Sequence, residues 1–140
     1  MSNTNRLAPA NINFTLQNGL GIYQGSDWYV GVTVTQKDCP NEQETPFDLT
    51  GYTGKCSIKR NAGDEDPIVE PTVTILDAEK GEFSLSLTSE ITATIPTTGK
   101  AYFETTLYQY DVYFVDENEN YFRAMEGYVS VSPTVTDNND

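Results

Sequence analysis

Apolar and polar residues alternate with a period of two along most of the chain. The clearest run begins at Trp28, where Val30, Val32 and Val34 are separated by small or polar residues. Because neighbouring side chains of a β-strand point to opposite faces, this pattern predicts a strand with one buried face. Similar runs occupy residues 12–16, 54–59, 72–75, 83–88, 110–114 and 122–131.

Turn sequences separate these runs. The segments "NAGDEDP", "LDAEKG" and "DENEN" are rich in residues that favour turns, and Gly81 is placed to adopt a positive φ. Residues 48–51 predict a tight turn that leads into the strand at residues 54–59, with Leu49 and Tyr52 packed beneath it. The alternation changes phase near Met125, which predicts a β-bulge there.

The segment "TSEITATI" carries the one helical signal. Thr88 or Ser89 can cap a helix, Ile91 and Ile95 lie four residues apart, and Pro96 ends the segment. We therefore expect one or two helical turns that connect two strands.

Together these elements predict an all-β protein. About seven or eight short strands with one helical turn are typical of an antiparallel β-sandwich of the Greek-key type. We expect an N-terminal arm at residues 1–11, the sandwich domain at residues 12–136 and a polar C-terminal tail at residues 137–140.

The charge of the chain limits its partners. Only 8 Lys and Arg stand against 21 Asp and Glu, a formal net charge of -13. Nucleic-acid binding needs clustered cations, and anionic membrane surfaces repel an acidic protein. No stretch approaches the roughly 20 apolar residues of a membrane span, and the N-terminus lacks the apolar core of a secretory signal. We expect a protein made and used in a cytoplasm, unless cell lysis releases it.

The residue types exclude several kinds of chemistry. The chain has no His, so a Ser or Cys nucleophile lacks its usual base. Cys39 lies in a loop sequence and Cys56 in the middle of a predicted strand, without the spacing of a zinc site. Two unpaired thiols fit a reducing compartment, and a disulfide between them is the alternative. We expect no enzymatic activity, no cofactor and no small-molecule substrate.

Acidic residues fall mostly in predicted turns, where water solvates them. Glu104, Asp111 and Glu126 are the exceptions, since they lie in apparent strands, and Arg123 can pair with Glu126 or across the hairpin. A carboxylate pair of the glycosidase type is conceivable, but solvated turn residues are the preferred interpretation.

Two turns contain oxygen ligands at spacings that suit a cation. Asp116, Asn118 and Asn120 follow the spacing of a calcium loop, but Tyr121 stands where the loop needs Gly and Gly127 where it needs the bidentate Glu. Asp64 and Asp66 of the second turn could ligate a hard cation. The plain turn is preferred in both places, so no metal site is predicted.

Aromatic residues cluster between residues 102 and 122. They form either cross-strand pairs or a contact surface for a protein partner or a sugar. The candidates for partner binding among them are Tyr102, Phe103, Tyr108 and Tyr113.

Lys55 and Lys59 complete the set of partner-binding candidates. They share the solvent face of one strand about 13 Å apart, which we interpret as too far for one site. They either guard an edge strand against mispairing or face an acidic neighbour.

Four segments together resemble a protein family. In order, they are "IYQGSDWYVGVTVT", "FDLTGYTGKCSIKR", "VTILDAEKGEFSLSLTSEITATI" and "YQYDVYFVDENENYFRAMEGYVSVSPTVT". They resemble the N-terminal domain of the upper baseplate protein of tailed phages and its short stand-alone relatives, over residues 22–136. The loops at residues 37–45 and 96–107 look longer than is usual in that family.

The resemblance implies an immunoglobulin-like sandwich that serves as a structural adaptor in a virion, in the tail, baseplate or head–tail neck. It implies multimeric assembly with other virion proteins and no enzymatic activity. A capsid decoration or head-fibre protein and a carbohydrate-binding module are the alternatives.

Overall fold

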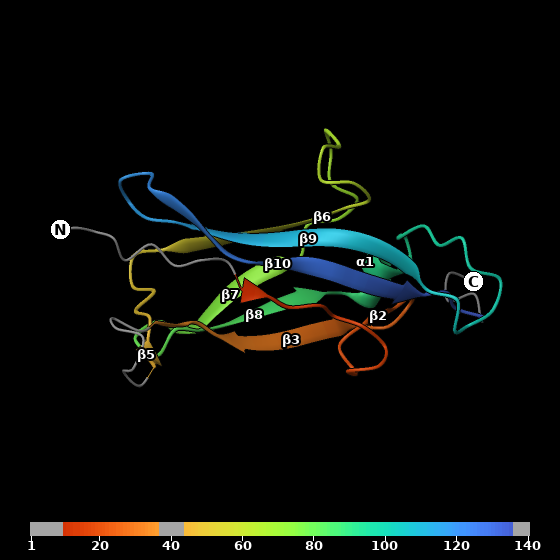
Figure 1. The fold of residues 1–140 in the computed structure, drawn as a ribbon, viewed down its shortest axis with the longest axis horizontal. Helices are drawn as coiled ribbons and strands as arrows, with labels where there is room; N and C mark the ends of the chain where they lie inside the picture. Colours follow the sequence, from red (N-terminus) through yellow and green to blue (C-terminus); the bar gives the residue numbers. More distant parts are fainter. Residues whose placement is uncertain (1–9, 37–43, 136–140) are drawn as a thin grey trace.

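The computed structural model describes residues 10–36 and 44–135. These residues form two β-sheets that pack face to face, which confirms the predicted sandwich (Figure 1). Cys39, most of the predicted N-terminal arm and the whole predicted C-terminal tail lie outside the described residues.

The larger sheet contains five strands. Its order is β1 (Ala10–Asn11), β10 (Tyr121–Ser132), β9 (Thr106–Val115) and β6 (Thr53–Lys59), and β2 (Ile22–Tyr23) also pairs with β10. We call it the upper sheet, from its place in Figure 1. The central strand β9 is antiparallel to both β10 and β6, while β1 and β2 pair with β10 in parallel.

The lower sheet has the order β3 (Trp28–Thr33), β8 (Glu82–Leu87) and β7 (Thr72–Asp77). Both of its pairings are antiparallel. A separate two-stranded ribbon joins β4 (Thr35–Gln36) to β5 (Thr45–Pro46). The long strands β3, β7 and β8 lie in the lower sheet and β6, β9 and β10 in the upper sheet. This division is the one found in immunoglobulin-like sandwiches, which confirms the predicted fold class.

The core lies between the sheets and is made by the apolar positions of the alternating pattern. In β3, Trp28 and Val30 are buried while Tyr29 is exposed. Phe83 of β8 and Phe114 of β9 are fully buried and meet edge to face, with ring centroids 5.1 Å apart. Aromatic pairs in this geometry stabilise a core beyond the area that they bury.

The turn before β6 forms as predicted. The Asp48 carboxylate accepts hydrogen bonds from the backbone and the hydroxyl of Thr50, Gly51 has a φ of 85°, and Leu49 is completely buried beneath. Tyr52 packs against the core from the same side. Gly81 adopts a φ of 71° in the β7–β8 turn, also as predicted.

The helix α1 (Ser89–Thr92) forms one turn between β8 and β9, as expected. Thr88 caps it, since its hydroxyl accepts a hydrogen bond from the backbone of Ile91. Ile91 is exposed and Ile95, beyond the helix, is fully buried, so the four-residue spacing of these two does not define one helical face. Thr92 points inward instead and donates to the Ser26 carbonyl.

The N-terminal segment differs from the expected strand at residues 12–16. Within it, only Phe14 makes a β-bridge, to Val129. From Ala10 onward the chain runs beside β10 and parallel to it. The carbonyl of Ile12 comes so close to Gly127 that a Cβ there would lie 2.2 Å from it. Glycine at position 127 therefore allows the N-terminal segment to lie close beside β10 in the upper sheet.

Replacing Gly127 by Ala should destabilise the fold. The new methyl group meets backbone, which cannot move aside like a flexible side chain, so we expect a loss of about 1–3 kcal/mol in the free energy of unfolding. Urea denaturation measures it. Gly31→Ala is the control, because a Cβ there meets nothing within 4 Å, and an equal loss in both variants would contradict the prediction.

Candidate functional site

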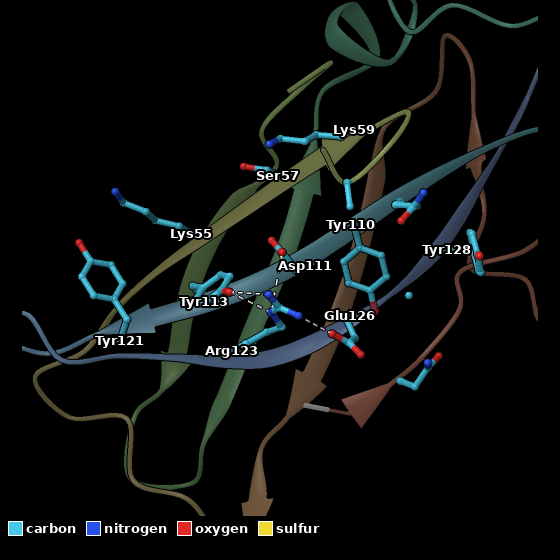
Figure 2. A pocket seen from close by; sticks show the side chains of 14 residues that line it. Lys55, Ser57, Lys59, Tyr110, Asp111, Tyr113, Tyr121, Arg123, Glu126 and Tyr128 are labelled. Atoms are coloured by element: carbon cyan, nitrogen blue, oxygen red, sulfur yellow. Dashed lines mark hydrogen bonds and ion pairs between the residues drawn. The ribbon is translucent and has the colours of Figure 1, made fainter. Parts of the chain in front are cut away.

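A hollow lies on the outer face of the upper sheet, across β6, β9 and β10. It has a volume of about 710 Å³ and includes Ala62, from the loop that rises above this face between β6 and β7 (Figure 1). Figure 2 shows its polar centre between Tyr121 at one end and Tyr128 at the other. The charged residues that line it are Lys55, Lys59, Asp111, Arg123 and Glu126.

Arg123 organises the centre of the hollow. Its Nη1 donates to Glu126 Oε1 at 2.8 Å, and its Nε and Nη2 donate to the Tyr113 hydroxyl at 2.9 and 2.7 Å. Its guanidinium also lies 5.2 Å from the centre of the Tyr113 ring. The hydrogen bonds to Glu126 and Tyr113 raise the pKa of Arg123, so the charged form is favoured, and the same bonds hold the guanidinium in position. The predicted pairing of Arg123 with Glu126 is confirmed.

A β-bulge makes this arrangement possible. Residues 123 and 126 are three apart, and strict alternation would place them on opposite faces of the strand. The register of β10 against β9 shifts between Arg123 and Met125, as the change of phase predicted, and Ala124 and Met125 are both buried. The shift turns Arg123 and Glu126 to the same outer face.

Asp111 lies on β9 opposite Glu126, with its Oδ2 3.9 Å from Arg123 Nε. Partial burial raises the pKa of Asp111, and the charges of Arg123 and Lys59 offset this only in part. Its ionised form is therefore less favourable in the folded protein than in the unfolded chain.

Lys55 and Lys59 both line the hollow, so the interpretation that they lie too far apart for one site is wrong. Sequence spacing measures the distance along the strand, whereas the hollow extends over both positions. Lys59 Nζ donates to the Asp64 carbonyl at 2.7 Å. Lys55 is exposed, and its side chain makes no hydrogen bond or ion pair within the described residues. It is thus the cation of the hollow that is open to a partner.

Tyr102 and Phe103 lie elsewhere, on the loop that leads from α1 to β9 at one end of the sandwich (Figure 1). They are 68% and 66% exposed, and their rings meet edge to face with centroids 5.4 Å apart. Apart from Tyr108, the predicted partner-binding residues therefore form two separate surfaces, which we call the hollow and the aromatic pair (Tyr102 and Phe103).

The prediction that Tyr108 contacts a partner at the surface is wrong. It is buried to 3% exposure, its hydroxyl donates to the Pro96 carbonyl, and Arg60 covers its ring at 5.4 Å. Alternation along β9 runs in phase from Tyr108 to Phe114, which points Tyr108 inward. Tyr113, on the opposite phase, is half-buried in the hollow, where its hydroxyl accepts from Arg123.

The remaining sequence candidates have structural roles. Glu104 lies in a turn rather than in a strand. Asp116 holds the β9–β10 turn by accepting from the backbones of Asn118 and Asn120, and Asp64 accepts from the backbone of Asn61. Cys56 is buried, which raises the pKa of its thiol. Within residues 10–36 and 44–135, no three His, Cys, Asp or Glu side chains are grouped to hold a metal ion.

No protein-family model matches the chain, and a search of curated proteins found no match either. Among the helices of the described residues, none is long and apolar enough to cross a membrane.

The hollow as a unit was not predicted from the sequence. Its residues come from three strands that the sheet brings together, and Tyr128 carried no signal of its own. The phase change near Met125, combined with the pairing of Arg123 and Glu126, was the one pattern that pointed to a shared outer face at this position.

Asp111→Asn and Asp116→Asn should change stability in opposite directions. Because the folded-state pKa of Asp111 is raised, stability falls as the pH rises from 3.8 through that raised value. Asp111→Asn removes this loss and should stabilise the protein at pH 7. Hydrogen bonds from Asn120 lower the pKa of Asp116, so its ionised form contributes stability above pH 3.8 that is lost on acidification.

Urea denaturation at pH 7 and at a pH well below 3.8 measures both effects. Asp116→Asn should destabilise the protein at pH 7, with a smaller difference from wild type at the acidic pH. Destabilisation by Asp111→Asn at pH 7 would show that its contact with Arg123 outweighs the burial of its charge.

Proposed function

We propose that this protein is a non-enzymatic structural protein of a phage virion. It would act as an adaptor in the tail, baseplate or head–tail neck, in a symmetric multimer bound to other virion proteins. The observation that carries the proposal is the aromatic pair, which stands exposed on a loop that is held in a fixed conformation.

Contacts on several sides hold this loop. The hydroxyl of Ser132 donates to the Tyr102 carbonyl at 2.7 Å, and the backbone of Thr98 donates to the Thr106 hydroxyl at 2.9 Å. Within the loop, Glu104 accepts from the backbone of Lys100 at 3.1 Å. The backbone is thus ordered before any partner arrives, which reduces the entropy lost on binding.

The chemistry of the pair suits a protein partner. Large aromatic side chains dominate the binding energy of protein interfaces when a partner covers them, and the loops at the ends of a sandwich are where such modules place their contacts. The resemblance of residues 22–136 to phage baseplate proteins supports the same role. A capsid decoration protein would use the pair in the same way, and the copy number per particle separates the two positions.

Carbohydrate binding is a second candidate, favoured by the hollow. Tyr121 and Tyr128 are 58% and 50% exposed at its two ends, with hydrogen-bonding groups between them. Aromatic rings flanking polar groups are a common arrangement for holding a sugar. A glycan array that detects binding by the wild type, and loss of that binding in Tyr121→Ala, would favour this candidate over the adaptor.

The double variant Tyr102→Ala/Phe103→Ala should remain folded but fail to join particles. Truncation of two central aromatic contacts commonly costs several kcal/mol of binding, so we expect the copies per purified particle to fall at least about tenfold. Quantitative mass spectrometry of particles measures this, and circular dichroism checks the fold.

Leu76→Ala is the matched control, because Leu76 is an exposed apolar residue, at 53%, on β7 of the lower sheet. It should leave incorporation unchanged. Absence of the wild-type protein from particles would refute the adaptor role, and normal incorporation of the double variant would refute the role of the aromatic pair.

A further inference from the structure

The outer edge of β3 is open. In the lower sheet, β8 is the one strand that pairs with β3 among the described residues. The backbone N–H of Val34 donates to the Gly81 carbonyl on the β8 side at 2.8 Å. Because backbone groups alternate in direction along a strand, those of Tyr29, Gly31 and Thr33 point away from β8, toward the open edge.

The other long edge strands carry devices that discourage further pairing, whereas β3 does not. On β6, Lys55 and Lys59 line the strand, and Ile58 is already bridged to Val69. On β7, the register shifts between Ile75 and Asp77. Charges and bulges are the usual protection of a sheet edge.

In contrast, β3 reads Trp-Tyr-Val-Gly-Val-Thr, with no charge and no proline, and it pairs with β8 without a register shift. It is a neutral strand of six residues that has no second neighbouring strand among the described residues. Such an edge is a template for another strand.

We propose that β3 pairs antiparallel with β3 of a second copy of this chain, about a two-fold axis at Gly31. The lower sheets of the two molecules would then form one continuous sheet. The residues with outward backbone groups are spaced symmetrically around Gly31, so this single register satisfies all three. Each of the three pairs exchanges two hydrogen bonds, which gives about six across the axis.

The side chains favour a second copy as the occupant. Tyr29 comes opposite Thr33 of the other copy, an aromatic and β-branched pair that stabilises antiparallel strands. At the axis, Gly31 meets its own copy, and a Cβ there would have nothing within 4 Å. The neutrality of β3 lets two acidic molecules approach without like charges at the contact. This inference does not depend on a role in a virion.

Gly31→Pro tests the hydrogen bonds of the interface. The N–H of Gly31 points outward, so proline removes the two bonds at the axis without breaking the ladder to β8. Sedimentation velocity from micromolar to near-millimolar concentration should show a dimer for the wild type and a dissociation constant at least about tenfold higher for the variant. Circular dichroism and urea denaturation check that the variant is folded.

Charged substitutions test the two-fold register and do not require a proline in the strand. Gly31→Lys and Gly31→Glu should each weaken the dimer, because like charges meet at the axis, while an equal mixture should form Lys–Glu heterodimers, detected by native mass spectrometry. Gly63→Lys is the control, since a Cβ there also meets nothing within 4 Å. It should leave the dimer unchanged.

Two outcomes would overturn the proposal. A wild-type protein that stays monomeric over the whole range shows that the open edge does not pair with a second copy. A dimer that persists equally in Gly31→Pro, Gly31→Lys and Gly31→Glu shows that the contact lies elsewhere.

Discussion

The passage of the N-terminal segment over Gly127 determines much of this structure. A side chain at that position would collide with the Ile12 carbonyl. Without one, Ile12 and Phe14 donate their backbone N–H groups to the carbonyls of Glu126 and Tyr128, and the Tyr110 hydroxyl donates to Ile12. The first strand thus belongs to the upper sheet, beside β10. The same choice leaves the position beside β3 in the lower sheet unfilled by the described residues.

The bulge in β10 and the loop before β9 show how the sandwich separates stability from surface chemistry. The bulge keeps Met125 in the core while it brings Arg123 and Glu126 to one face. The loop anchors its backbone through Ser132 and Thr106 while it exposes Tyr102 and Phe103. At the bulge, hydrogen bonds fix the guanidinium of Arg123, and in the loop they fix the backbone that carries Tyr102 and Phe103. The surface side chains are thus positioned without contributing to the core.

The sequence predicted the strands, turns and bulge well because period-two alternation and turn residues are local signals. It failed where tertiary contacts decide. Tyr108 looked like one of several surface aromatics until the phase of β9 placed it inside. Lys55 and Lys59 looked separate because the distance between them along β6 does not show that β9 and β10 extend the same outer face into one hollow. The segment at residues 12–16 alternates in sequence, but only Phe14 of it is buried, and it runs in parallel beside β10 without forming a regular strand.

The contact between Asn13 and Tyr128 spans 115 residues of sequence. A ribosome makes the segment around Asn13 well before it makes β10, so this segment must wait for its partner. Closing such a long loop is entropically slow, which makes the contact a late event in folding. Until then, the apolar surface that Phe14 covers is exposed to neighbouring chains. The synthesis of β10 is thus the step that allows β1 and the segment around Phe14 to join the upper sheet.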